Sequence, residues 1–181
     1  RVELRLPGRH NVENFLAAAT VAVSLGCSLE EIATAAAGLG AARMRGEILE
    51  VGGARVWDDS YNSNPDALGR TLAAAAELEA ERRWAVLGEM LELGPGSPAF
   101  HLEAGRTAAR LGFSPVVGVG EGARDLVTAA REGGVDARWV EDAAAAAEVA
   151  RGELRSGDLV VVKGSRGVGL EAVVAALAEV G

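Results

Sequence analysis

Cysteine, lysine and aromatic residues are scarce in this sequence of 181 residues. The single cysteine, Cys27, cannot form an intramolecular disulfide, and a chain without disulfides fits a reducing cytoplasm. Aromatic residues make up 4% of the chain and hydrophobic residues 49%, so a core must be built mainly from alanine, valine and leucine. No apolar run approaches the length of a membrane span, and no basic segment leads into one. We therefore expect a soluble, cytoplasmic protein.

Positive charge is also in short supply. Lysine and arginine number 18 against 26 acidic residues, which gives a net charge of −8. This balance argues against nucleic acid or an anionic membrane as a general partner. An anionic small molecule is still a possible ligand, because local arginines and helix N-termini can reverse the sign. The two histidines, His10 and His101, fall in different segments, so we expect no metal site made by this chain alone.

Two common catalytic motifs are missing. The chain contains no G-x-x-x-x-G-K-[ST] phosphate-binding loop and no G-x-S-x-G nucleophile elbow. The chain by itself therefore lacks an evident catalytic centre.

The first forty residues have helical character. Residues 2–6 alternate like a strand, and residues 11–26 carry apolar side chains at the helical period. Ser28 and Glu31 form a capping-box pattern that starts a second helix. One strand and two helices have no evident sheet of their own, so we interpret residues 1–40 as the tail of a larger domain.

From about residue 46 onward the pattern changes to alternating strands and helices. Residues 47–51 and 54–57 flank Gly52-Gly53, which predicts a hairpin. Further strands are expected at 84–87, 116–119, 137–140 and 159–162. Helices are expected at 65–79, 99–111, 123–131, 142–154 and 169–180. The strand segments are apolar without alternation, as in strands covered on both faces, so we predict an α/β fold with a doubly wound, mostly parallel sheet.

Polar or glycine-rich segments follow the expected strands, where ligands gather in such sheets. They are residues 58–64, 88–96, 120–122 and 163–167. Asn64-Pro65-Asp66 has the pattern of a helix start. Lys163 and Arg166 could bind an anion, or could be two solvated cations in a strand–helix turn.

Asn11 and Asn14 lie three residues apart, and so on one face of the first helix. Two amides near a helix N-terminus could hold a nucleotide base or phosphate edge. The alternative is that Asn11 caps the helix and Asn14 is solvated.

Four segments, in order along the chain, resemble the later part of the Mur ligases. They are "LPGRHNVENFLAAATVA", "RGEILEVGGARVWDDSYNSNPDAL", "AVLGEMLELG" and "VVVKGSRGVGLE". The resemblance covers essentially the whole chain and is strongest for members that join D-alanyl-D-alanine to UDP-N-acetylmuramoyl-tripeptide. It implies a role in peptidoglycan synthesis, and so in cell shape and division.

The resemblance also implies a domain organisation. Residues 1–40 would be the C-terminal end of the central ATPase domain, and residues 44–181 the Rossmann-like C-terminal ligase domain. ATP and Mg²⁺ would be the cofactors. The phosphate-binding loop and most magnesium ligands would lie in preceding domains of the same protein, outside this chain, so the chain alone should be inactive.

The resemblance assigns roles to three groups of residues. Arg45 would reach the γ-phosphate and act in catalysis. The expected nucleotide-binding residues are Asn11, Asn14, Asp59, Tyr61, Asn62 and Asn64. The expected dipeptide-binding residues are Lys163, Ser165 and Arg166.

Within these groups, Asp59 would accept a ribose hydroxyl, with Asp58 as the fallback, and Arg166 is the first choice for the dipeptide carboxylate. Glu89 and Ser63 depart from the aspartate and alanine that are usual in the family.

Three alternatives stay open. A receiver-like regulatory module also has an acidic pair after its first strand and a lysine after its last. It further needs a phosphoacceptor aspartate after its middle strand, and residues 116–120 offer none. The second alternative is another Mur-type amide ligase. The third is a non-catalytic α/β module that binds a small molecule. A phosphate-binding loop encoded upstream of this chain would favour a ligase.

Overall fold

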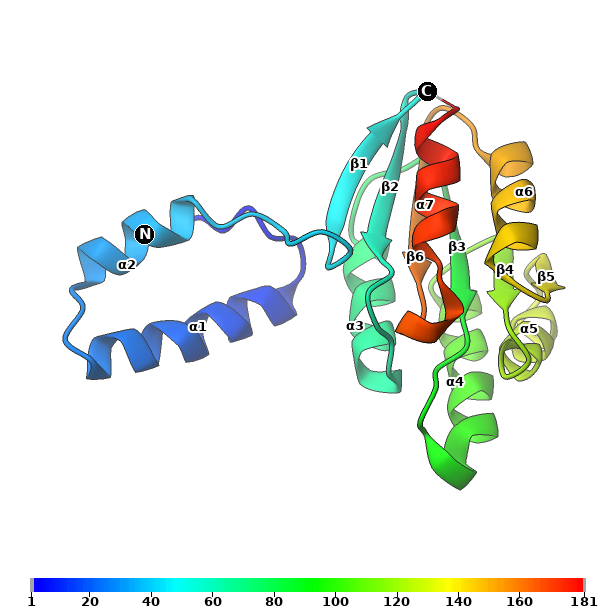
Figure 1. Cartoon of the computed structure of the whole chain (residues 1–181), viewed down its shortest axis with the longest axis horizontal. Helices are drawn as coiled ribbons and strands as arrows, with labels where there is room; N and C mark the ends of the chain where they lie inside the picture. Colours follow the sequence, from blue (N-terminus) through cyan, green and yellow to red (C-terminus); the bar gives the residue numbers. More distant parts are fainter. Residues whose placement is uncertain (1, 181) are drawn as a thin grey trace. The chain divides into compact units, whose positions relative to one another are not determined.

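A computed structural model describes residues 2–180 of the chain. The chain divides into two compact units, Arg1–Ala42 and Arg43–Gly181 (Figure 1). No described helix is both long enough and apolar enough to cross a membrane.

The first unit contains two helices, α1 (Arg9–Ser24) and α2 (Leu29–Ala37). The Ser28 hydroxyl accepts the Glu31 N–H at 3.2 Å, and the Glu31 carboxylate accepts the Ser28 N–H at 2.8 Å, which confirms the predicted capping box. The strand expected at residues 2–6 is wrong. A strand needs a neighbour with which to exchange backbone hydrogen bonds, and none of residues 2–41 forms one.

The second unit is built on a sheet of six strands in the order β1-β2-β6-β3-β4-β5. The strands are β1 (Glu47–Val51), β2 (Ala54–Asp59), β3 (Arg82–Gly88), β4 (Val116–Val119), β5 (Ala137–Val140) and β6 (Asp158–Lys163). β1 pairs with β2 antiparallel through the predicted hairpin, and every other pairing is parallel. The predicted doubly wound, mostly parallel sheet is therefore confirmed.

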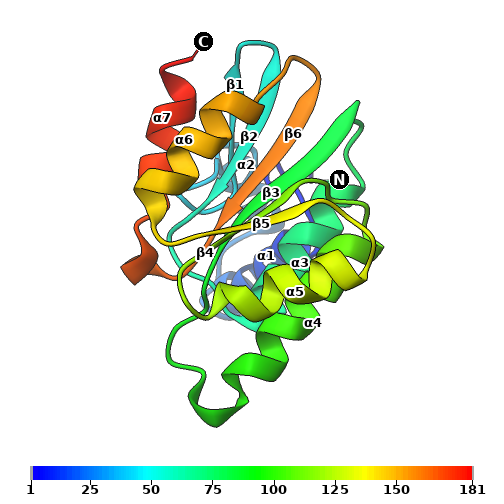
Figure 2. The ribbon, with the colours of Figure 1, turned by 90° about the vertical axis from the view of Figure 1, so that its right-hand side faces the viewer.

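Helices cover both faces of the sheet. The helices are α3 (Pro65–Ala76), α4 (Ser97–Arg110), α5 (Ala123–Glu132), α6 (Ala143–Glu153) and α7 (Glu171–Ala178), with short 3₁₀ turns η1 (Gly94–Gly96) and η2 (Arg166–Val168). Figure 2 shows α3, α4 and α5 on one face and α6 and α7 on the other. The predicted start of the last helix at residue 169 is two residues early, because Gly169 adopts a φ of +75° and separates η2 from α7.

Successive strand residues feed two separate cores. Ala85 and Leu87 of β3 pack in the layer under α3, α4 and α5, whereas Trp84 and Val86 pack in the layer under α6 and α7. Every residue of β6 is buried. This two-sided burial explains why the strands read as continuous apolar runs rather than as an alternating pattern.

The order of the strands creates a crevice at the carboxyl end of β6. The chain runs from β2 through α3, α4 and α5 in one direction across the sheet, then returns through α6 to place β6 between β2 and β3. The helix that follows β6 therefore lies on the opposite face from the helices that follow β2 and β3. Loops that diverge in this way leave room for a ligand between them.

The opposite, amino-terminal edge of the sheet is held by a partly buried ionic network. Arg82 donates from Nε to Asp158 Oδ1 at 2.8 Å and from Nη2 to Asp158 Oδ2 at 2.6 Å, and its Nη1 binds Glu153 at 2.6 Å. Asp158 also accepts the Trp84 Nε1–H at 2.9 Å and the Arg155 N–H at 2.9 Å. Burial alone would raise the pKa of Asp158, but the hydrogen bonds from Arg82, Arg155 and Trp84 outweigh it and lower that pKa.

We expect Asp158→Asn to lower the free energy of unfolding at pH 7 by about 3 kcal/mol, because it leaves Arg82 without its bidentate partner. The folded pKa of Asp158 lies below the unfolded one. The stabilisation is therefore present above the unfolded pKa of roughly 4 and is lost as pH falls through the folded pKa. Urea unfolding at pH 7 and at pH 3 should show the difference from wild type shrinking in acid.

Glu103→Gln is the matched control, because Glu103 pairs with arginines only on the exposed surface. It should change stability little at either pH. An Asp158→Asn deficit that is the same at both pH values would contradict this account of the network.

Candidate functional site

A pocket of ≈ 470 Å³ lies at the carboxyl edge of the sheet, in the crevice described above. It is lined by residues 61–64 after β2, 91–93 after β3 and 165–167 after β6. The predicted polar segments after these three strands therefore meet in one place. The fourth segment, at 120–122, does not line this pocket, and its Gly122 N–H donates to the Glu89 carboxylate at 2.9 Å.

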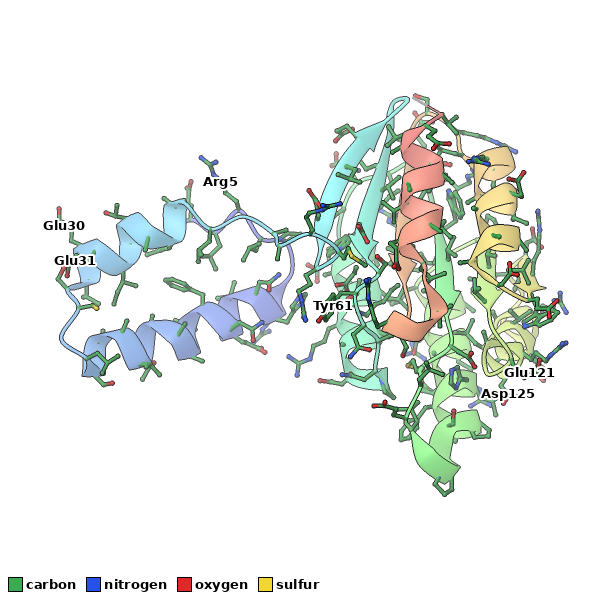
Figure 3. All side chains as sticks on the ribbon, viewed as in Figure 1. Arg5, Glu30, Glu31, Tyr61, Glu121 and Asp125 are labelled. Atoms are coloured by element: carbon green, nitrogen blue, oxygen red, sulfur yellow. The ribbon has the colours of Figure 1, made fainter. Side chains whose placement is uncertain are left out.

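Two arginines flank an exposed tyrosine at this pocket. The guanidinium carbon of Arg45 lies 3.9 Å from the centroid of the Tyr61 ring, and that of Arg166 lies 5.9 Å from it. Figure 3 labels Tyr61 beyond the end of β2. Two cations therefore lie close together at this pocket, in a chain whose net charge is −8.

The backbone before β1 places Arg45 next to the ring. Met44 adopts a φ of +62°, and its carbonyl accepts the Tyr61 N–H at 3.0 Å. Its sulfur lies 3.5 Å from Arg166 Nη1, which also pairs with Glu171 at 3.2 Å. A left-handed conformation costs energy for a non-glycine residue, so its presence beside the pocket marks a constrained segment.

The two aspartates at the end of β2 have different surroundings. Asp58 is buried, and its Oδ1 accepts the Ser60 N–H at 3.1 Å and the Ser60 hydroxyl at 2.6 Å. Asp59 is partly exposed, and its Oδ2 lies 2.7 Å from Lys163 Nζ and 2.8 Å from Thr71 Oγ1. Asp58 thus serves the turn itself, whereas Asp59 belongs to an ionic contact between neighbouring strands.

The asparagines of this loop are also engaged. Asn64 Oδ1 accepts the Ala67 N–H at 2.8 Å and caps α3, with Pro65 at the first helical position, which confirms the predicted helix start. Asn62 Oδ1 accepts the Ser63 N–H at 2.9 Å.

Ser165 links the three loops that form the pocket. Its buried hydroxyl accepts the Leu91 N–H at 2.9 Å and donates to the Ser63 carbonyl at 3.4 Å, and its own N–H donates to the Glu89 carbonyl at 3.3 Å. The loops after β2, β3 and β6 are therefore connected through one side chain.

His101 has a role here that the sequence did not indicate. It is 1% exposed, and its Nε2 accepts the Met90 N–H at 2.8 Å while its Nδ1 lies 2.8 Å from the Ser97 carbonyl. Both bonds require the neutral tautomer with the proton on Nδ1. The His101 side chain connects the loop after β3 to α4. No local sequence motif predicts a contact of this kind between a helix and a loop.

The Glu89 side chain leaves no room for a Cβ atom at Gly120 and little at Gly122. A Cβ at Gly120, where φ is +92°, would lie 2.7 Å from Glu89 Oε1, and one at Gly122 would lie 3.0 Å from Oε2. Gly120 and Gly122 therefore leave room for the Glu89 side chain, which packs against them.

Asn11 and Asn14 belong to the first unit. The helix cap is Gly8 rather than Asn11, and Asn11 Nδ2 donates to the Pro7 carbonyl at 2.8 Å. The interpretation of Asn11 as a helix cap is therefore wrong. Asn14 follows on the exposed surface of α1.

Within residues 2–180, no three His, Cys, Asp or Glu side chains gather in a way that could hold a metal ion. Cys27 is free and exposed.

Comparison with known proteins adds the family context. Residues 44–166 match the family described as "Mur ligase, glutamate ligase domain". Over 95% of this chain's length, it is 39% identical to the UDP-N-acetylmuramoyl-tripeptide–D-alanyl-D-alanine ligase of Mycobacterium leprae. Over 99% of this chain's length, it is 35% identical to the ligase of the same name from Escherichia coli. It spans only 37% and 39%, respectively, of those two proteins.

Solved structures agree in fold. A crystal structure of MurF from Acinetobacter baumannii matches with a TM-score of 0.88 and 27% identity, over 98% of this chain and 40% of that one. The MurF ligase from Thermotoga maritima in complex with ADP matches with a TM-score of 0.84 over 99% of this chain and 40% of that one; at 24% identity it supports the fold alone.

We expect Ser165→Ala to lower the free energy of unfolding by about 1–2 kcal/mol, because the Leu91 N–H and the Ser63 carbonyl lose their shared partner. Ser114→Ala is the matched control, since Ser114 makes one exposed hydrogen bond at 3.3 Å to the Asp136 N–H. Denaturant unfolding of both variants measures the difference. Equal losses would mean that Ser165 does not connect the loops energetically.

Proposed function

This chain belongs to the Mur ligase family, and on that basis we propose that it forms the C-terminal part of an ATP-dependent ligase. The complete enzyme adds D-alanyl-D-alanine to UDP-N-acetylmuramoyl-tripeptide in peptidoglycan synthesis, in the cytoplasm. The observation that carries this proposal is the match over 95–99% of the chain to ligases named for that reaction.

The proposal divides the chain into two functional parts. Residues 44–181 are the C-terminal ligase domain. Residues 1–40 are the end of the central ATPase domain, and the packing of the first unit supports this: α1 has no buried residue, and Leu16, Val21 and Leu25 are exposed. Apolar helix faces of this kind need a further partner, which the missing part of that domain would supply.

The chemistry joins a carboxylate to an amine. The terminal carboxylate of the tripeptide takes the γ-phosphoryl group of ATP, which gives an acyl phosphate and ADP. The dipeptide amine then attacks the acyl carbon, and the tetrahedral intermediate collapses to the amide and phosphate. Phosphate is a far better leaving group than oxide, which is why the reaction requires ATP.

The residues of this chain bind and orient the reactants. Arg45 is the residue assigned to the γ-phosphate, because a permanently charged, planar guanidinium suits a phosphoryl group. Tyr61 and Asn62 are assigned to the edge of the adenine site, and Asp59 to a ribose hydroxyl. Asn64 contributes through its position beside the pocket, since its side-chain oxygen already caps α3.

Arg166 is assigned to the carboxylate of the incoming dipeptide. Its side chain is 57% exposed, and it borders the same pocket as Ser165. Asn11 and Asn14 are assigned to the nucleotide from the first unit. Magnesium ligands are assigned to the part of the enzyme outside this chain.

The substrate assignment can be tested on the full-length protein. With ATP, Mg²⁺, UDP-N-acetylmuramoyl-tripeptide and D-alanyl-D-alanine, we expect phosphate release that depends on both acceptor and dipeptide. A single amino acid in place of the dipeptide is the control for another Mur-type amide ligase. Phosphate release that is indifferent to the dipeptide would reject the proposal.

Arg45→Ala in the full-length protein should lower kcat by roughly a hundredfold or more, with a much smaller effect on the affinity for ATP, because the charge it meets develops during phosphoryl transfer. Arg43→Ala, at the exposed arginine two residues earlier, is the matched control and should retain near wild-type turnover. Unchanged turnover in Arg45→Ala would remove this residue from the mechanism.

A further inference from the structure

Lys163 is the only lysine in the chain and the last residue of β6. Its neighbour across the parallel pairing is Asp59, the last residue of β2. The side chain of Lys163 is 3% exposed and that of Asp59 is 20% exposed. The family resemblance placed this lysine among the residues that bind the dipeptide, but its surroundings point to a different role.

The ammonium group of Lys163 is already committed within the protein. Nζ donates to Asp59 Oδ2 at 2.7 Å and to the Asn62 carbonyl at 2.9 Å, which uses two of its three protons. A buried ammonium that left these partners for a substrate carboxylate would strand the Asp59 charge in a poorly solvated place. Arg166, on the same loop, is 57% exposed, and its ion pair with the 43% exposed Glu171 at 3.2 Å is one that water can replace.

The contacts of Asp59 are one-sided. Oδ2 receives Lys163 Nζ and also lies 2.8 Å from Thr71 Oγ1, whereas no hydrogen bond among residues 2–180 uses Oδ1. The Thr71 hydroxyl is also 3.0 Å from the Ala67 carbonyl, and its single proton can serve only one acceptor at a time. The carboxylate is the stronger acceptor of the two, so the Thr71 proton goes to Asp59 Oδ2. Asp59 is therefore held through Oδ2, and Oδ1 is left to accept a hydrogen bond from a ligand.

The second bond of Lys163 reaches the loop itself. The Asn62 carbonyl belongs to the segment that carries Tyr61 and lines the pocket. One buried cation therefore fixes both the carboxylate at the end of β2 and the backbone of the loop that follows it. A rigid support of this kind is what keeps a binding group in its productive orientation.

We propose that Lys163 is a positioning residue for the nucleotide site: it orients Asp59, with Thr71, so that Oδ1 accepts a ribose hydroxyl, and it does not contact the dipeptide. This inference rests on the proposed role of Asp59 in the family reaction. It moves Lys163 from the residues expected to bind the dipeptide to those that serve the nucleotide.

The test measures ADP affinity of the full-length protein by calorimetry for Lys163→Met, Asp59→Asn and the double variant. Each single change should weaken ADP binding by about tenfold, because each removes a hydrogen bond to a charged group or its support. The double variant should also lose about tenfold rather than a hundredfold, because the two residues act as one unit. Additive losses, or an unchanged affinity in Lys163→Met, would overturn the proposal.

A matched control separates positioning from general stability. Arg82→Met breaks the partly buried ionic network at the other edge of the sheet, so it should lower stability while leaving ADP affinity unchanged. If Lys163→Met does not fold, Thr71→Val keeps the ion pair and removes only the hydroxyl. It should weaken ADP binding by about twofold to fivefold, and unchanged ADP affinity in Thr71→Val would equally overturn the proposal.

Whether Lys163 binds the dipeptide is tested with the phosphate-release assay. Lys163→Met should raise the KM for ATP and leave the KM for D-alanyl-D-alanine unchanged, whereas a dipeptide-binding lysine would give the reverse. ADP binding does not depend on which substrates the enzyme joins. A wild-type enzyme indifferent to the dipeptide would therefore reject the proposed function while the binding measurements still decide the role of Lys163.

Discussion

The insertion of β6 between β2 and β3 is the constraint on which the rest of the second unit depends. Because the chain reverses direction across the sheet to make this pairing, the loop after β6 leaves toward the opposite face from its two neighbours. The same pairing brings Lys163 beside Asp59 and puts Ser165 within reach of the loops after β2 and β3. The crevice and the bonds that hold its walls thus have one origin.

Charged side chains lie at both edges of the sheet, but their contacts differ between the two edges. At the amino-terminal edge, the charged groups of Arg82 and Asp158 bind each other, and Asp158 also accepts the Trp84 N–H. We expect this network to stabilise the fold. At the carboxyl edge, the guanidinium groups of Arg45 and Arg166 lie 3.9 and 5.9 Å from the centroid of the exposed Tyr61 ring, and Arg166 also pairs with Glu171. In a protein of net charge −8, these two arginines are the local positive charges that an anion at this pocket would meet.

The match to longer ligases gives this division a functional meaning. The chain spans about two-fifths of the relatives it matches, and the open carboxyl edge presents its arginines without a phosphate-binding loop in the same chain. Under the proposed function, other domains of the complete enzyme would supply the remaining groups for phosphoryl transfer and would exclude water. Under the same proposal, those domains would also cover the exposed apolar residues of α1 in the first unit.

The sequence by itself determined the elements and their class: apolar runs without alternation, the Asn64 cap and the Ser28 box are local signals that act over a few residues. It also placed polar segments at the ends of the strands. The strand expected at residues 2–6 was wrong because strand pairing is not local. Only the tertiary structure decided that Lys163 faces Asp59 across 104 positions and that His101 holds the loop after β3. Side-chain partners distant in sequence are set by how strands are ordered, and no pattern within a segment encodes that order.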